Sequence, residues 1–158
     1  MSEIKLKSNT MESLVSFLTE TTCKVNDLMS YVPDIHYGKV IKVYDGDTIT
    51  IATALHNGDI YPSMGLYQFH VRLLGIDTPE LKTKNVAEHE LGILARDALS
   101  EMIINKVVRL ENISYDKYGR ILCHVFLGDI NMSEWLTSKK YAVYYNGGTK
   151  VKKWGQDA

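Results

Sequence analysis

The chain has few cysteines, few prolines and no long apolar run. Its 158 residues include two cysteines, Cys23 and Cys123, and three prolines. Two cysteines so far apart exclude a disulfide framework and the paired spacing of a zinc site, so we expect an intracellular, reducing compartment. No stretch reaches the roughly 20 apolar residues of a membrane span. The N-terminal segment also lacks the continuous apolar core of a signal peptide.

An excess of charge of one sign is lacking as well. Eighteen basic and 19 acidic residues give a net charge of −1, so the chain has no overall field that would attract a polyanion. Any binding of nucleic acid must therefore be local. The hydrophobic fraction of 45% and the charged fraction of 23% are typical of an ordinary globular protein and exclude a disordered or fibrous chain.

The N-terminal part is predicted to be a helical extension. Residues 9–30 have amphipathic spacing, and Asn9 with Glu12 forms a capping-box pattern. We therefore predict a helical extension over residues 1–35 and a domain over residues 36–158. The helix either packs on the domain or docks a partner or a second copy of the chain, and the sequence leaves both possibilities open.

The rest of the chain alternates between strand and helix patterns. We predict five strands, a helix between the third and fourth strands, and a C-terminal helix, an order typical of an OB-fold barrel in the α+β class. One rim of such a barrel stays open, and loops there collect ligand-binding residues. The predicted strands are residues 36–54 (two strands joined at Asp45-Gly46), 68–76, 107–113 and 121–126, and the helices are residues 85–105 and 131–141.

The segment Val71–Glu80, VRLLGIDTPE, places an arginine and two acids in an apolar strand. A buried guanidinium costs several kcal/mol, roughly, unless an anion lies nearby, so Arg72 implies an anionic partner or ligand. Arg72 and Asp77 are an odd number of residues apart and can share a face only if the chain bends between them. Gly75 permits that bend.

Two further turns carry polar residues. DGDT supplies Asp45 and Asp47, and DKYGR leads into a strand that begins at Arg120. Each turn alone is typical of a solvated surface turn. Together with the central segment, the turns supply carboxylates for a hard cation and guanidinium groups that match phosphate oxygens. A further carboxylate can orient or deprotonate a water molecule, so the combined set predicts a phosphodiester hydrolase.

The three motifs DGDT, RLLGIDTPE and DKYGR stand in an order and spacing that resemble those of the staphylococcal nuclease (thermonuclease) family. The resemblance covers residues 37–145. It implies that Ca²⁺ binds to Asp47, Asp77 and the backbone carbonyl of Thr78. It also implies that Arg72 and Arg120 contact the scissile phosphate, that Glu80 acts on the attacking water, and that the nucleotide lies beside Lys117 and Tyr118.

The resemblance implies a Ca²⁺-dependent endo- and exonuclease with little sequence specificity. Its expected substrates are single-stranded or frayed DNA and RNA, and its expected products carry a 3′-phosphate. The alternative is a non-catalytic module of the Tudor-staphylococcal-nuclease kind, which keeps the barrel but binds RNA or protein. Such modules usually lack parts of the acidic and arginine set, whereas this chain has all of it, so we expect catalysis.

Three features outside the motifs leave questions open. The loop over residues 54–66 is longer than in the compact family pattern. The family places a base-stacking tyrosine after the last helix, where this chain offers Tyr141, Tyr144 and Tyr145. A basic cluster near the C-terminus either holds a nucleic-acid backbone or belongs to a solvated, frayed terminus, and it consists of Lys150, Lys152 and Lys153.

Overall fold

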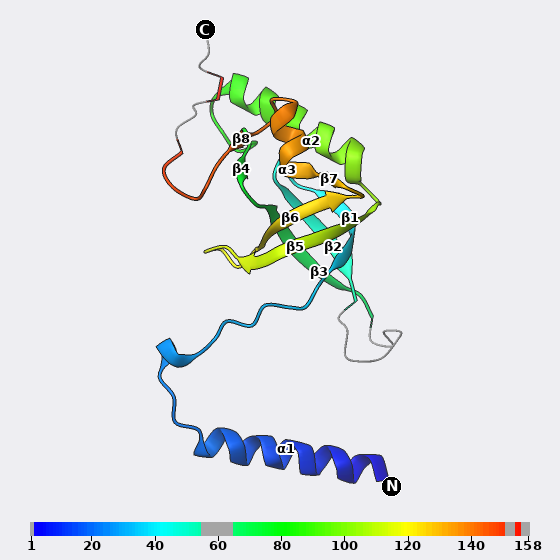
Figure 1. Cartoon of the computed structure of the whole chain (residues 1–158), viewed down its shortest axis with the longest axis vertical. Helices are drawn as coiled ribbons and strands as arrows, with labels where there is room; N and C mark the ends of the chain where they lie inside the picture. Colours follow the sequence, from blue (N-terminus) through cyan, green and yellow to red (C-terminus); the bar gives the residue numbers. More distant parts are fainter. Residues whose placement is uncertain (1, 55–64, 151–153, 156–158) are drawn as a thin grey trace. The chain divides into compact units, whose positions relative to one another are not determined.

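The computed structural model describes residues 2–54, 65–150 and 154–155 (Figure 1). The chain divides into two compact units, Met1–Tyr31 and Val32–Ala158, and the second unit contains every predicted site residue. Among the described residues, no helix is both long and apolar enough to cross a membrane. Most of the predicted long loop, and Lys152 and Lys153 of the basic cluster, lie outside the described residues.

The N-terminal unit contains helix α1 (Ser2–Glu20) and a short 3₁₀ helix, η1 (Val25–Asp27). The predicted bounds of 9–30 were wrong at both ends. The residues before Asn9 include glutamate, leucine and lysine, which favour helix, so Asn9 lies inside α1 and does not cap it. At the other end the Thr21 hydroxyl donates to the Phe17 carbonyl (2.7 Å), a side-chain bond that competes with continuation of the helix.

The second unit contains a closed five-stranded barrel, which confirms the predicted fold class (Figure 1). The strands follow the order β3-β2-β1-β5-β6, and a parallel pairing of β3 with β6 closes the sheet. Closure removes the free edges of the sheet and fixes which strand ends meet at each rim. The strands are β1 (Tyr37–Val43), β2 (Thr48–Thr53), β3 (Tyr67–Leu73), β5 (Val107–Tyr115) and β6 (Ile121–Leu127).

Two helices accompany the barrel, α2 (Val86–Ile103) between β3 and β5 and α3 (Met132–Ser138) after β6 (Figure 1). Each begins at an asparagine cap: Asn85 accepts from the Glu88 amide at 3.2 Å, and Asn131 accepts from the Ser133 amide at 2.9 Å. Helix α3 ends earlier than predicted because the chain enters a left-handed conformation at Lys140, where φ is 64°.

Three strands of two residues each were not predicted. They are β4 (Ile76–Asp77), β7 (Ile130–Asn131) and β8 (Val143–Tyr144). Strands β4 and β8 pair antiparallel although they lie far apart in the sequence, and this pairing brings the C-terminal segment beside Asp77. Two residues are too few to show the period-two pattern that identifies longer strands.

The core fills the barrel and continues under α2. Alternate residues of β6, Ile121, Cys123 and Val125, point inward and are buried, as the period of a strand requires. Leu99 and Ile103 of α2 belong to the same buried cluster. This packing holds the ends of the strands rigidly, so the loops at the rim have defined positions.

Gly46 lies where the β1–β2 turn meets α2. A Cβ atom at this position would lie 2.8 Å from Ala95 Cβ and 2.9 Å from Thr78 Cγ2. We expect Gly46→Ala to lower the free energy of unfolding by about 1–3 kcal/mol through overpacking. Urea unfolding should show a lower midpoint at an unchanged slope. In the control Gly148→Ala the added Cβ meets only Asn146 Oδ1, at 3.3 Å, and an equal loss there would contradict this explanation.

Candidate active site

All the predicted site residues line one cavity of about 1100 Å³ at a rim of the barrel. They come from separate parts of the chain: the β1–β2 turn, strand β3, strand β4 with the turn after it, and the β5–β6 turn. The closed barrel is what brings these segments to the same rim. The predicted residues on the cavity wall are Asp47, Arg72, Asp77, Thr78, Glu80, Lys117, Tyr118 and Arg120.

The chain bends sharply between Arg72 and Asp77. Strand β3 ends at Leu73, Gly75 has a φ of 86°, and β4 then begins at Ile76. The bend lets the guanidinium of Arg72 fold back on the following strand, where Nη1 donates to the Ile76 carbonyl oxygen at 3.2 Å. The bend anticipated at Gly75 is thus present, and it places Arg72 and Asp77 on the same side of the chain.

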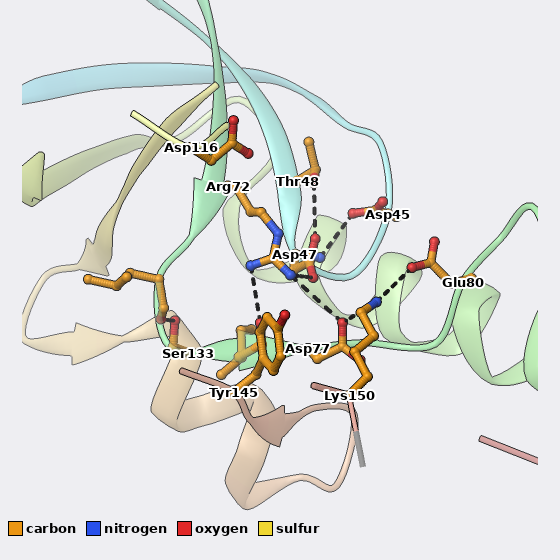
Figure 2. Close-up of polar contacts among 12 residues, drawn as sticks. Asp45, Asp47, Thr48, Arg72, Asp77, Glu80, Asp116, Ser133, Tyr145 and Lys150 are labelled. Carbon is orange, nitrogen blue, oxygen red and sulfur yellow. Dashed lines mark hydrogen bonds and ion pairs between the residues drawn. The ribbon is translucent and has the colours of Figure 1, made fainter. Parts of the chain in front are cut away.

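Arg72 is largely buried and pairs with two buried carboxylates (Figure 2). Its Nη2 atom lies 3.1 Å from Asp47 Oδ2 and 3.7 Å from Asp77 Oδ1. The exposed fractions of the side chains are only 14% for Arg72, 9% for Asp47 and 6% for Asp77. The two carboxylates offset the cost of burying the guanidinium, which explains how an arginine can stand on a core strand.

The buried carboxylate of Asp47 has two negatively charged neighbours, Asp45 and Asp77, and one positively charged neighbour, Arg72. Burial, followed by the charge of Asp45, raises the pKa of Asp47 to about 7 although Arg72 and a hydrogen bond from Thr48 lower it. Asp77 adds to the upward shift. Asp45 is held close because its Oδ1 accepts from the Asp47 amide at 3.1 Å. An additional cation in the cavity would therefore be stabilised.

The guanidinium of Arg120 is oriented by Asp116, the first residue of the DKYGR turn, to which the sequence alone gave no role. Asp116 Oδ1 accepts from the amides of Tyr118 (2.8 Å) and Arg120 (3.0 Å), while Oδ2 accepts from Arg120 Nε at 2.7 Å. Burial acts in the opposite direction, but these hydrogen bonds and the charge of Arg120 lower the pKa of Asp116, so it stays ionised. The signal in the sequence was an aspartate at the start of a glycine-containing turn, because aspartate side chains there often accept hydrogen bonds from the turn's own amides.

The far end of the Arg120 guanidinium joins the same polar network. Its Nη1 lies 3.4 Å from Thr48 Oγ1, and Thr48 donates in turn to Asp47 Oδ1 at 3.0 Å. The two arginines are therefore connected through Thr48 and Asp47. Both arginines line the same cavity.

Lys150, which the sequence placed in a basic cluster near the C-terminus, pairs with two acidic residues of the cavity. Its Nζ atom lies 2.8 Å from Asp77 Oδ1 and 3.0 Å from Glu80 Oε1 (Figure 2). Partial burial lowers the pKa of the ammonium, but the bonds to Asp77 and Glu80 outweigh it and raise that pKa above its ordinary value. The sequence carried no signal for this contact, because Lys150 and Glu80 are distant in the chain.

The segment that carries Lys150 is anchored on both sides. Val143 pairs with Asp77 in the β4–β8 ladder, and the Tyr145 amide donates to the Gly75 carbonyl at 2.9 Å. Beyond Lys150, the carbonyl of the buried Trp154 accepts from Asn85 Nδ2 at 3.3 Å. These anchors keep residues 143–150 beside the cavity.

The structure separates the three candidate tyrosines. Tyr141 packs against the core and its ring centroid lies 6.4 Å from that of Trp135, so it is a packing residue. Tyr144 and Tyr145 both line the cavity. The Tyr145 ring centroid lies 5.9 Å from Arg72 Cζ (Figure 2), and that of Tyr118 lies 5.5 Å from Arg120 Cζ. Each guanidinium therefore has an aromatic ring beside it.

The donor set at the cavity fits a hard divalent cation that takes oxygen ligands. In the described part of the chain, no group of three or more His, Cys, Asp and Glu side chains is arranged to hold a metal ion. A cation there would need the carboxylates of Asp47 and Asp77 and further oxygen ligands from the backbone or from water. The observation that favours such an ion is the grouping of the Asp45, Asp47 and Asp77 carboxylates in one cavity.

The fold and this cavity define an OB-fold domain with an arginine- and carboxylate-lined cavity at the barrel rim. The chain belongs to the family of staphylococcal nuclease homologues, whose sequence model matches residues 70–157. The matched region includes Arg72 and Arg120 but begins after Asp47.

Curated relatives agree with this assignment. A thermonuclease of Staphylococcus hyicus is 33% identical over 130 residues, covering 81% of this chain and 70% of the relative. An uncharacterised protein of Methanocaldococcus jannaschii is 32% identical over 154 residues, covering 80% and 69%. An uncharacterised endonuclease of Escherichia coli is 29% identical over 113 residues, covering 71% and 62%.

Proposed function

We propose that this protein is a Ca²⁺-dependent nuclease that hydrolyses phosphodiester bonds in DNA and RNA, with a preference for single strands. The observation that carries the proposal is the convergence on one cavity of two arginines and three carboxylates from different segments. These residues are Arg72, Arg120, Asp47, Asp77 and Glu80. The thermonuclease and endonuclease among the relatives support the class of reaction.

Arg72 and Arg120 are proposed to bind the phosphate that is attacked. Guanidinium groups bind phosphate oxygens through two parallel hydrogen bonds and stabilise the additional charge of the transition state. Asp116 and the Tyr118 ring restrict Arg120, while Asp47 and the Tyr145 ring restrict Arg72. Both arginines would therefore be positioned before the substrate arrives, which lowers the cost of reorganisation.

Asp47, Asp77 and the backbone carbonyl of Thr78 are proposed to hold the cation. When bound, a divalent cation supplies positive charge that polarises the phosphate and stabilises charge in the transition state. Glu80 is proposed to orient or deprotonate the attacking water. Its side chain is 55% exposed at the mouth of the cavity, so water has access to it.

Lys117 and Tyr118 are proposed to lie beside the nucleotide. The Lys117 ammonium sits 5.1 Å from the Tyr118 ring centroid, so a cation and an exposed aromatic face stand together at the cavity. Contacts to phosphate carry no sequence information, and stacking tolerates every base. Low sequence specificity and a preference for unpaired bases follow.

The second candidate is a nucleic-acid or protein interaction module without catalysis. Its prediction is binding of single-stranded nucleic acid with no cleavage under any cation. Retention of both arginines and all three carboxylates favours catalysis. The proposed function concerns Val32–Ala158 alone, because nothing in the described residues supports assembly through the N-terminal helix.

Glu80→Gln tests the proposal at the chemical step. With end-labelled single-stranded DNA in Ca²⁺, we expect kcat to fall about 100-fold, the lower part of the range for an acid–base residue, because exposed Glu80 can be partly replaced by solvent. KM should change little, since the amide keeps the shape of the side chain. Glu101→Gln on α2 removes the same charge far from the motifs and serves as the matched control.

Two outcomes would count against this assignment. Wild-type protein that binds the oligonucleotide but never cleaves it would favour the interaction module. Cleavage by Glu80→Gln at the wild-type rate would leave the phosphodiesterase proposal standing but would remove Glu80 from the reaction.

A further inference from the structure

The ammonium of Lys150 connects two carboxylates that have different proposed roles. It lies 2.8 Å from Asp77 Oδ1, a proposed cation ligand, and 3.0 Å from Glu80 Oε1, the proposed water-activating group (Figure 2). Asp77 is buried, and its Oδ1 atom is also 3.7 Å from Arg72 Nη2. Lys150 therefore supplies the positive charge on the side of Asp77 that faces Glu80.

A divalent cation and the Lys150 ammonium are not expected to bind beside Asp77 at the same time. Both are attracted to Asp77, but they repel each other, and inside a partly buried cavity that repulsion is weakly screened. Either the cation or the ammonium can hold Asp77 at short range without the other. The two should therefore compete for the same carboxylate.

We propose that Lys150 is an internal cation that holds Asp77 and Glu80 in place and is displaced from Asp77 when a divalent cation binds. This inference rests on the proposed function, because it takes Asp77 to be a cation ligand. Binding of the cation and docking of Lys150 are then coupled with opposite sign, and the coupling is reciprocal. The position of the Lys150 ammonium would then report occupancy of the site.

The surroundings of Lys150 permit such a displacement. Its side chain is 47% exposed, and four methylene groups separate the ammonium from the backbone. The anchors of the segment, the β4–β8 pairing and Trp154, do not depend on the ammonium. Lys150 can therefore leave Asp77 by side-chain rotation while the backbone stays in place.

The first measurement is the affinity for Ca²⁺, by calorimetric titration of the metal-free, full-length protein. Lys150→Met keeps the length of the side chain and removes its charge. We expect Kd for Ca²⁺ to decrease about five- to 150-fold, the usual range for a coupling between two sites. Lys117→Met is the matched control: it removes the same charge from the same cavity wall, but the Lys117 ammonium lies over Tyr118, and its effect should be smaller.

The second measurement follows Lys150 in the wild-type protein without any substitution. An amine-directed acylating reagent, with the extent of modification at each lysine read by mass spectrometry, reports how available each ammonium is. Ca²⁺ should increase modification of Lys150 several-fold relative to Lys117. A Lys150 that becomes less reactive with Ca²⁺ would mean that it stays docked, which would overturn the inference.

The titration also separates this inference from the proposed function. No Ca²⁺ binding to any of the three proteins would overturn both. Equal affinity of wild type and Lys150→Met, or an equal gain in both methionine variants, would overturn only the role of Lys150. Weaker binding by Lys150→Met would show that the lysine organises the cation ligands, which is the opposite of competition.

Discussion

Removal of divalent cations is expected to lower cleavage of single-stranded DNA by about 10³-fold or more, because a bound cation supplies several kcal/mol of transition-state stabilisation and each 1.4 kcal/mol is a factor of ten. Asp77→Asn and Asp47→Asn should cause losses of similar size in saturating Ca²⁺. Each substitution removes one of the two buried carboxylates proposed to hold the ion. Single-turnover rates in Ca²⁺, and in excess chelator, would measure both effects.

Asp97→Asn is the matched control for the aspartate variants. Asp97 pairs with Arg96 on the exposed face of α2, so this substitution should leave the rate unchanged. Circular dichroism should confirm that all three variants are folded. Full cleavage in excess chelator would contradict the cation assignment, while loss of activity in Asp97→Asn would indicate that the assay reports stability.

Arg72→Lys and Arg120→Lys are each expected to lower kcat by about 10²–10³-fold. Lysine keeps the charge but cannot make the two parallel hydrogen bonds of a guanidinium to phosphate oxygens in the transition state. The comparison of initial rates and KM on the same oligonucleotide would place the loss in kcat. Wild-type turnover in both variants would contradict the phosphate-binding role.

The two arginine variants should differ in stability. Arg72 is buried with Asp47 and donates to the Ile76 carbonyl, so Arg72→Lys should also lower the free energy of unfolding, by about 1–3 kcal/mol. Arg120 is more exposed, so Arg120→Lys should change the free energy of unfolding very little. Arg109 pairs with Glu111 and lies beside the Phe126 ring, outside the cavity motifs. Arg109→Lys keeps the positive charge there and controls for the arginine-to-lysine change itself.

Local patterns in the amino-acid sequence predicted the barrel and named the candidate residues of its site. Alternation in β1, β2, β3, β5 and β6 and the helical spacing of α2 are local patterns, because burial of one face leaves a period of two or 3.6 residues in the sequence. Gly75 marked a bend because few other residues adopt its backbone conformation, and Asp45-Gly46 marked a turn because this residue pair is common in hairpin turns. The three motifs then named every residue proposed for chemistry.

Which of these side chains meet, and what else joins them, depends on contacts between distant segments of the folded chain. The contact between Arg72 and Asp47 depends on the neighbouring positions of β2 and β3, and the proximity of Arg120 depends on closure of the barrel by β3 and β6. Lys150 reaches the cavity through β4 and β8, a pairing of two residues with no detectable period. Contacts between distant segments leave no local pattern, so the ammonium beside Asp77 could be found only in the folded chain.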